Sequence, residues 1–217
     1  RVNVGKLFKG QFEIVEDCEV FETEALQIIC CSYPEDEKKT AAWINEQRSN
    51  SMMSLLLGHF QLAGAQQSSG VTTTGVDKHC IEWVDLGLLG HIHKPQRVCA
   101  NIHYVGSPFQ QHWGEKGEEK RVAVVDTSNL EVLWVPLKGF PVYREVTFEE
   151  FSAVAGGKSE DRFKVLLRSP DESAQFYQHK QAHQAVPVYE YTPQEQETAK
   201  ASSVLWERDA VFKRYLE

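Results

Sequence analysis

Two histidines, His91 and His93, stand one residue apart in the stretch LLGHIHKPQ (88–96), directly after an apolar run that ends in glycine. A third, His59, follows another apolar run and Gly58. Neutral imidazole nitrogens are good ligands for Mn²⁺, Fe²⁺ and Zn²⁺. The alternative is that these are ordinary surface or core histidines, but the repeated order of apolar run, glycine and histidine favours a metal site. We assign no chemistry to the remaining histidines, which are His79, His103, His112, His179 and His183.

The elements that must position these imidazoles are two short apolar segments, 52–57 and 81–90. The first is too short for a typical helix, and both end in glycine, so we expect strands whose tips carry the histidines. Ligand sites in α/β proteins gather in the loops beyond strand ends. A histidine from one strand tip would then meet the pair from the neighbouring tip.

The rest of the chain alternates strand and helix signals. Strand-type composition predicts strands before the first helix, and Gly106-Ser107-Pro108 predicts a turn. Ser169 and Pro170 predict a helix start there, with Glu172 completing a capping box. We expect strands at 12–16, 18–23, 25–33, 101–105, 121–127, 130–137, 141–148, 162–169 and 186–193, and helices at 34–50, 148–156, 169–185 and 194–217.

Composition sets limits on function. The formal net charge is −8, whereas proteins that bind nucleic acid without help usually carry a basic surplus. If this protein meets DNA, metal ions, a partner or further sequence must supply positive charge. No segment approaches the roughly 20 apolar residues that cross a bilayer, so we expect no membrane contact. The five cysteines are odd in number and form no C-x-x-C pair, which favours reduced thiols in the cytoplasm.

Three stretches together resemble a known family. LLLGHFQLAG (55–64), LLGHIHKP (88–95) and YVGSPFQQHWGE (104–115) look like the C-terminal half of a calcineurin-like metallophosphoesterase. The Gly-His-x-His element recurs across that superfamily, and the Gly-Ser-Pro segment with its Gly-Glu is more specific to the SbcD-type DNA nucleases of phage and bacterial recombination. The resemblance covers roughly residues 1–137.

The resemblance implies an α/β fold of the two-sheet α/β/β/α sandwich type and a metal-dependent DNA exonuclease or phosphodiesterase. In that family two divalent metal ions, usually Mn²⁺, clamp the phosphodiester. Carried over by position, His59 and His91 would bind one metal and His93 the other. Lys94 and Ser107 would border the bound DNA strand.

This sequence lacks the family's remaining metal ligands, which come from an Asp-x-His element, a bridging Asp and an Asn-His-Asp element. The resemblance therefore assigns no catalytic residue here. Because the chain begins with Arg1 rather than Met, we expect it to be the C-terminal portion of a longer product. The alternative is a naturally inactive form. Any homodimer would use the family's N-terminal helices, which have no counterpart in this sequence.

The expected domains are the metallophosphoesterase portion at 1–137, a small α+β capping domain at 138–195, and a C-terminal helix at 196–217. Apolar residues in 203–216 would suit docking on an SbcC-like ATPase subunit, or equally packing against the helix's own domain. Two other functions remain open: a phosphoesterase acting on a small phosphoester, and a scaffold that binds a partner but no metal pair.

Overall fold

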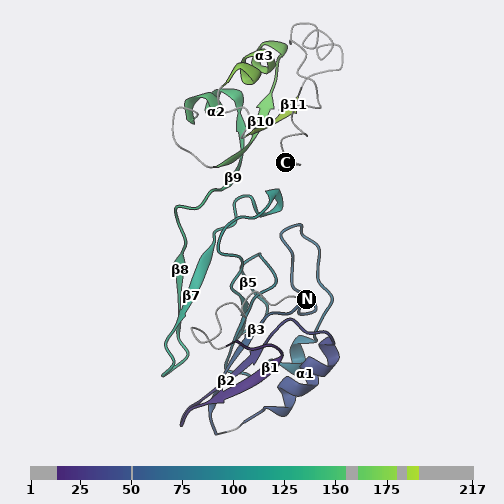
Figure 1. Ribbon diagram of the computed structural model, residues 1–217, viewed down its shortest axis with the longest axis vertical. Coiled ribbons are helices and arrows are strands. Elements are labelled where there is room, and N and C mark those ends of the chain that lie inside the picture. Colours follow the sequence, from purple (N-terminus) through teal and green to yellow (C-terminus); the bar gives the residue numbers. More distant parts are fainter. Residues whose placement is uncertain (1–13, 50, 155–160, 180–184, 191–217) are drawn as a thin grey trace. The chain divides into compact units, whose positions relative to one another are not determined.

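The structure is a computed structural model that describes residues 14–49, 51–154, 161–179 and 185–190. It divides into two compact units, with the division between Phe140 and Pro141 (Figure 1). The domain boundary expected from the sequence lay slightly earlier, between 137 and 138. The helix expected at 196–217, with its apolar residues, lies outside the described residues.

A six-stranded sheet forms the centre of unit 1, in the order β1-β2-β3-β4-β6-β5. Strands β2, β3, β4 and β6 are parallel, and the two edge strands are antiparallel to their neighbours. The carboxyl ends of four neighbouring strands therefore meet at one edge of the sheet. The strand bounds are β1 Cys18–Glu22, β2 Leu26–Cys31, β3 Met53–Gly58, β4 Leu86–Leu89, β5 Gln96–Arg97 and β6 Ile102–Tyr104.

Both faces of this sheet are covered, which explains the nearly continuous apolar runs of its strands. On one face Ile29 and Leu56 pack with Ile44 of α1 (Glu37–Glu46). On the other face Leu55 and Leu86 pack against the antiparallel ribbon of β7 (Arg121–Val125) and β8 (Val132–Pro136). The described part of unit 1 thus has three layers: helix, sheet and ribbon.

The fold is therefore mixed α/β with several sheets. The strand expected at 12–16 is wrong in its described part, because 14–16 has no strand pairing. Helix α1 is also shorter than the expected 34–50. It begins after Asp36, whose carboxylate accepts hydrogen bonds from the N–H groups of Lys38 and Lys39. None of the helices in the described part of the chain has the length and apolar composition that a bilayer crossing requires.

Unit 2 alternates strand and helix. Its three strands are parallel, in the order β11-β10-β9, with the phenyl rings of Phe151 and Phe176 packed on Phe163 and Val165 of the central strand. Parallel strands joined by helices make this unit α/β, so the expected α+β class is wrong. The bounds are β9 Tyr143–Thr147, α2 Phe148–Val154, β10 Arg162–Leu167, α3 Pro170–Gln178 and β11 Ala185–Tyr189.

The predicted start of α3 is confirmed. The Ser169 hydroxyl accepts the N–H of Glu172 at 3.2 Å, and Pro170 occupies the first helical position. The reciprocal bond of the capping box differs, because the Glu172 carboxylate accepts the N–H of Arg168 instead of that of Ser169. The helix ends at Gln178, where the chain becomes extended at His179, so the expected extent of 169–185 is too long.

Tyr104 at the end of β6 ties that strand to the loop after β3. Its fully buried hydroxyl donates to the carbonyl of Phe60 at 2.9 Å and accepts the N–H of Leu62 at 2.8 Å. Burial raises the pKa of Tyr104 to about 12, although the Leu62 N–H opposes this effect. This hydroxyl fixes the segment that carries His59.

Tyr104→Phe is expected to lower the free energy of unfolding by about 1–3 kcal/mol, because it leaves two buried backbone groups without partners. The wild type should lose this advantage as pH rises from about 10 to about 12, because the folded state holds the phenolic proton more tightly than the unfolded state. Urea unfolding of both proteins across this range checks the prediction. A difference that stays constant with pH would contradict it.

Candidate metal centre

Two of the predicted ligands lie together at the carboxyl edge of the parallel sheet. His59 follows β3 and His91 follows β4, and these strands are hydrogen-bonded neighbours. Their ring centroids are 5.4 Å apart, with the planes nearly perpendicular. Tyr33, which follows β2, places its ring 5.0 Å from that of His91. The strand order therefore brings the two imidazoles together, as their position after strand ends predicted.

Gly90 explains why a glycine precedes His91. A Cβ atom at position 90 would lie 2.7 Å from Nδ1 of His59, so only glycine lets that imidazole rest against the backbone of the neighbouring strand. The Gly90 N–H also donates to the carbonyl of Gly58, at 2.8 Å. Gly90 is thus a packing requirement of the imidazole pair, whereas a Cβ atom at Gly58 would meet Phe60 and Leu89 instead.

Gly90→Ala is expected to displace the His59 ring and weaken divalent metal binding by about 10-fold or more, as ligand misplacement does. No left-handed backbone angle adds strain at this position, so thermal stability should change little compared with the loss of affinity. Isothermal titration with Mn²⁺, together with a thermal melt, tests this. Unchanged Mn²⁺ affinity in a folded variant would show that the His59 position is unimportant.

The backbone at His91 is unusual. Its φ angle of 77° lies in the left-handed region, which few residues other than glycine adopt, although asparagine, aspartate and histidine do so more often than the rest. Such strain concentrates at functional sites. The amide nitrogen of Gln61 donates to Nε2 of His91 at 2.8 Å, so a metal bound through Nε2 would have to replace this hydrogen bond.

Both imidazoles favour the neutral form that binds metals. Burial lowers the pKa of His59, and the nearby His93 lowers it further. Burial also lowers the pKa of His91, with added repulsion from His59 and His93. A neutral imidazole has a free lone pair on one of its two ring nitrogens. At neutral pH these two rings therefore need not lose a proton before they bind a cation.

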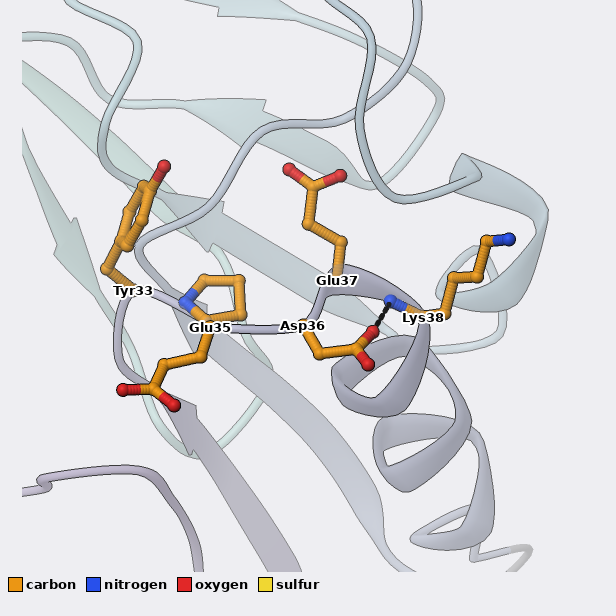
Figure 2. Close-up of a pocket in the computed structure, with 6 residues that line it drawn as sticks. Tyr33, Glu35, Asp36, Glu37 and Lys38 are labelled. Atoms are coloured by element: carbon orange, nitrogen blue, oxygen red, sulfur yellow. Dashed lines mark hydrogen bonds between the residues drawn. The ribbon is translucent and has the colours of Figure 1, made fainter.

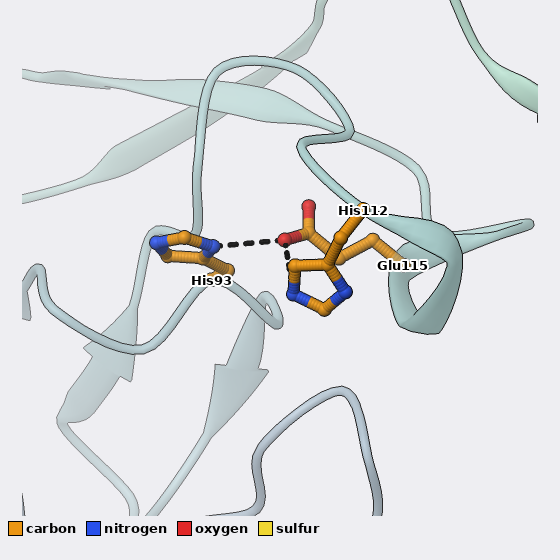
Figure 3. A group of neighbouring side chains, drawn as sticks. All are labelled: His93, His112 and Glu115. Carbon is orange, nitrogen blue, oxygen red and sulfur yellow. Dashed lines mark hydrogen bonds and ion pairs between the residues drawn. The ribbon is translucent and has the colours of Figure 1, made fainter. Parts of the chain in front are cut away.

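His93 is held by a carboxylate. Its Nδ1 lies 2.8 Å from Oε1 of Glu115, whose side chain is 0% exposed. In Figure 3 the second ring nitrogen of His93 points away from Glu115. A carboxylate behind one nitrogen is the common way in which proteins orient a metal-binding histidine and fix its tautomer. This arrangement leaves Nε2 of His93 as the ligand atom.

Glu115 is the centre of a buried polar network. Its Oε2 atom lies 2.7 Å from Nζ of Lys120, which is also buried, and 3.1 Å from the hydroxyl of Ser107. The N–H of Gln111 donates to the same oxygen at 3.2 Å. Burial alone would raise the pKa of Glu115, but hydrogen bonds from Lys120, His93 and Gln111 outweigh it and hold the pKa at about 2. The carboxylate is therefore ionised and saturated with donors.

His112 also joins this network. Its Nε2 lies 3.0 Å from Oε1 of Glu115, and its Nδ1 accepts the N–H of Gly114 at 3.1 Å. Ligand atoms of His93, His112 and Glu115 lie within 4.8 Å of one another, close enough to hold one metal ion (Figure 3). However, both nitrogens of His112 are engaged, and a metal among the three would displace two N–H bonds to Glu115. We therefore interpret the group as support for His93.

Sequence reasoning missed His112 and the role of Glu115. The sequence contains HWGE (112–115), but no residue spacing reveals that this loop folds back onto LLGHIHKPQ. The one sequence feature that pointed to this loop was Glu115 itself, at the end of the segment 104–115 that resembles the family. The contact depends on the turn at Gly106, where φ is 91° and the neighbouring Ser107 N–H donates to the carbonyl of His93 at 3.1 Å.

Two cavities lie in this part of unit 1, and histidines line the first of them. One, of about 260 Å³, is lined by His91, Ile92, His93, His112 and 67–69. The other, of about 810 Å³, lies beside Tyr33 and is rimmed by carboxylates (Figure 2). In Figure 2 the Tyr33 hydroxyl and the Glu37 carboxylate extend from the chain, whereas Asp36 turns back to cap α1. The first cavity is the one in which a ligand would meet the imidazoles.

Lys94 and Ser107, which were expected to border a DNA strand, do not line the cavity of His91, His93 and His112. The Ser107 side chain is buried, and its hydroxyl is within hydrogen-bonding distance of Glu115 and of the Phe109 carbonyl. The Lys94 ammonium donates to the side-chain carbonyl of Gln66 at 3.3 Å and lines a separate cavity of about 350 Å³. Their DNA contact stays a prediction, and Ser107 has a clear internal role.

Comparison with known proteins adds no assignment. No protein-family profile matches this chain, and a search among curated proteins finds no significant match. The interpretation of the site therefore rests on its residues and geometry.

Proposed function

We propose that this chain supplies the histidine-rich half of a two-metal phosphodiesterase centre, in a DNA nuclease subunit of the SbcD type. One observation carries the proposal. His59 and His91, from neighbouring parallel strand ends, lie ring against ring, and His93 beside them is oriented by the buried Glu115. Three imidazoles at the carboxyl edge of a parallel sheet are suited to divalent cations.

The residues fit a metal in part. His59 and His91 would hold one cation and His93, through Nε2, a second, with Mn²⁺ expected. When bound, such a pair supplies Lewis-acid stabilisation of a phosphoryl group and activates water. Three imidazole ligands are too few for two dications, so the proposal requires carboxylate ligands from further sequence. The chain's own contribution is to favour the neutral form of His59 and His91 and to hold all three imidazoles aligned and partly shielded from water.

The carboxylates near the site limit the route by which a negatively charged substrate can approach. The large cavity beside Tyr33 presents Glu35 and Glu37, which would repel the phosphates of DNA. DNA would therefore approach along the cavity of His91, His93 and His112. A small phosphoester, the substrate class of the second candidate function, could reach the imidazoles along the same cavity.

The remaining parts of the proposal follow the resemblance. Unit 1 would belong to a four-layer α/β/β/α sandwich, and unit 2 would cap bound DNA. The C-terminal segment at 196–217 would dock on an SbcC-like ATPase in the cytoplasm, and a homodimer would form through further sequence. A scaffold without metal or activity is the alternative that direct measurement must exclude.

The test uses the full-length gene product. Metal content is measured by mass spectrometry after dialysis against Mn²⁺, and hydrolysis is measured on linear DNA, bis-p-nitrophenyl phosphate and p-nitrophenyl phosphate. About two Mn²⁺ per chain and Mn²⁺-dependent cleavage of DNA would support the proposal. Turnover of the small esters alone would favour the second function. A protein without bound metal that cleaves none of the three would be a scaffold.

A further inference from the structure

Two cysteines face each other across the edge of the large sheet. Cys18 of β1 and Cys31 of β2 are direct partners in the antiparallel register, and their sulfur atoms are 3.0 Å apart. Both are thiols. No other described pair of cysteines has a recorded sulfur contact, and the adjacent Cys30 is paired with Glu19 in the same register.

The hydrogen-bond pattern places this pair at a position that suits a disulfide. Directly opposed residues of antiparallel strands alternate between hydrogen-bonded and non-hydrogen-bonded pairs. The Ser32 N–H donates to the carbonyl of Asp17, its opposed residue, so that pair is hydrogen-bonded and the next pair, Cys18–Cys31, is not. At the other end of the strand pair, the Thr23 N–H donates to the carbonyl of its opposed residue, Leu26. Alternating pair by pair from there also makes Cys18–Cys31 a non-hydrogen-bonded pair. Non-hydrogen-bonded partners have Cα atoms about 4.5 Å apart, within the range that disulfides span.

We propose that Cys18 and Cys31 are an oxidative modification site that closes to a disulfide, with a low-molecular-weight disulfide such as oxidised glutathione as the oxidant. The Cys18 thiol loses its proton and attacks one glutathione sulfur, which breaks that S–S bond and releases one glutathione thiolate. The Cys31 thiolate then attacks the Cys18 sulfur and releases the second glutathione. Two cysteine thiols are oxidised and one glutathione disulfide is reduced to two thiols.

Access sets this order of steps. Cys31 is only 4% exposed, whereas Cys18 is half-buried on an edge strand. The small oxidant reaches Cys18 first, and Cys31 completes the bond from inside the sheet. Burial raises the pKa of both thiols, so the first attack is slow at neutral pH.

The bond would fasten the edge strand to the sheet that carries the metal centre. Edge strands have a neighbour on one side only and open more readily than central ones. The Cys31 carbonyl accepts the N–H of His59 at 3.0 Å, so one cross-linked residue is hydrogen-bonded to the backbone of a candidate metal ligand. The inference does not depend on the proposed function, because its test reads out covalent structure and thermal stability.

The experiment incubates the full-length protein with oxidised glutathione and maps the free and linked cysteines by mass spectrometry. Glutamyl endopeptidase is the appropriate protease, because Glu19, Glu22 and Glu24 lie between the two cysteines and trypsin has no site there. The expected product is a peptide containing Cys18 linked to the peptide that contains Cys30 and Cys31. Reduction by dithiothreitol should separate them and lower the Tm by several degrees.

Three variants make the assignment specific. Cys30→Ser should keep the link and the Tm shift, whereas Cys18→Ser should lose both. Cys80→Ser, in a different part of unit 1, is the matched control and should behave as the wild type. The proposal is overturned if the wild type keeps all its thiols, or if Cys30→Ser loses the link. A Cys30–Cys31 bond in the wild type would also overturn it.

Discussion

Replacing His91 by alanine is expected to reduce Mn²⁺-dependent phosphodiester hydrolysis by about 100-fold or more, while the protein stays folded. The loss of one imidazole leaves His59 as the single imidazole ligand of its cation, and a factor of 100 corresponds to about 2.7 kcal/mol of transition-state stabilisation. Stability should change little, because the His91 ring is only partly buried. The strain of the left-handed backbone at this position comes from the Cβ atom, which alanine also has. Activity on DNA and metal content are measured on the same sample.

His79→Ala is the matched control for this variant. His79 is a histidine of unit 1 whose side chain is 69% exposed and is paired with Glu82, with no contact to His59 or His91. Its loss should leave metal content and turnover unchanged. If His91→Ala keeps full Mn²⁺-dependent activity, the ligand assignment is wrong. If both variants lose activity equally, the effect is not specific to the site.

The second large effect concerns stability. Glu115→Ala is expected to lower the free energy of unfolding by about 3 kcal/mol, because it leaves the buried ammonium of Lys120 without its closest partner. The value lies at the low end for a broken buried ion pair, since Glu118 still contacts that ammonium at 2.9 Å. The same change frees the His93 ring and should weaken metal binding. Urea unfolding curves and Mn²⁺ titration measure the two effects separately.

Two variants separate charge from shape at this position. Glu115→Gln keeps the hydrogen bonds to Ser107 and Gln111 but loses the ion pair, so its stability should lie between that of the wild type and of the alanine variant. Adding Lys120→Met to Glu115→Ala should recover part of the lost stability, because the buried ammonium that lost its closest partner is then removed as well. The recovery is partial because Glu118, whose side chain is 14% exposed, loses its ion pair with Lys120. An alanine variant within 0.5 kcal/mol of the wild type would mean that the network contributes little net stability.

The sequence predicted the strand ends that bear histidines, because apolar runs and glycines are local signals. It also predicted the start of α3, where Ser169 and Pro170 act on their immediate neighbours. Helix ends were predicted less well, since α1 and α3 both stop before the polar residues that continue their patterns. Unit 2 was assigned to α+β because alternating strands and helices do not by themselves specify the direction of pairing.

The supporting half of the site could not be predicted. Glu115 and His93 are brought together by a loop that reverses at Gly106, and no periodicity records such a contact. The same holds for Cys18 and Cys31, whose sulfur contact depends on the strand register. Residues that act on their immediate neighbours can be recognised in a sequence, whereas pairs formed by tertiary contact become evident only in the folded structure.

The parallel order of β2, β3, β4 and β6 has a kinetic consequence. Each of these pairings joins segments separated by a helix or a long loop, and sheets dominated by such distant contacts assemble slowly. The two imidazoles come from different strands, so they become neighbours only when β3 and β4 have paired. During refolding, Mn²⁺ affinity should therefore appear only when β3 and β4 have paired. Added metal would stabilise the folded protein without increasing the rate at which folding begins.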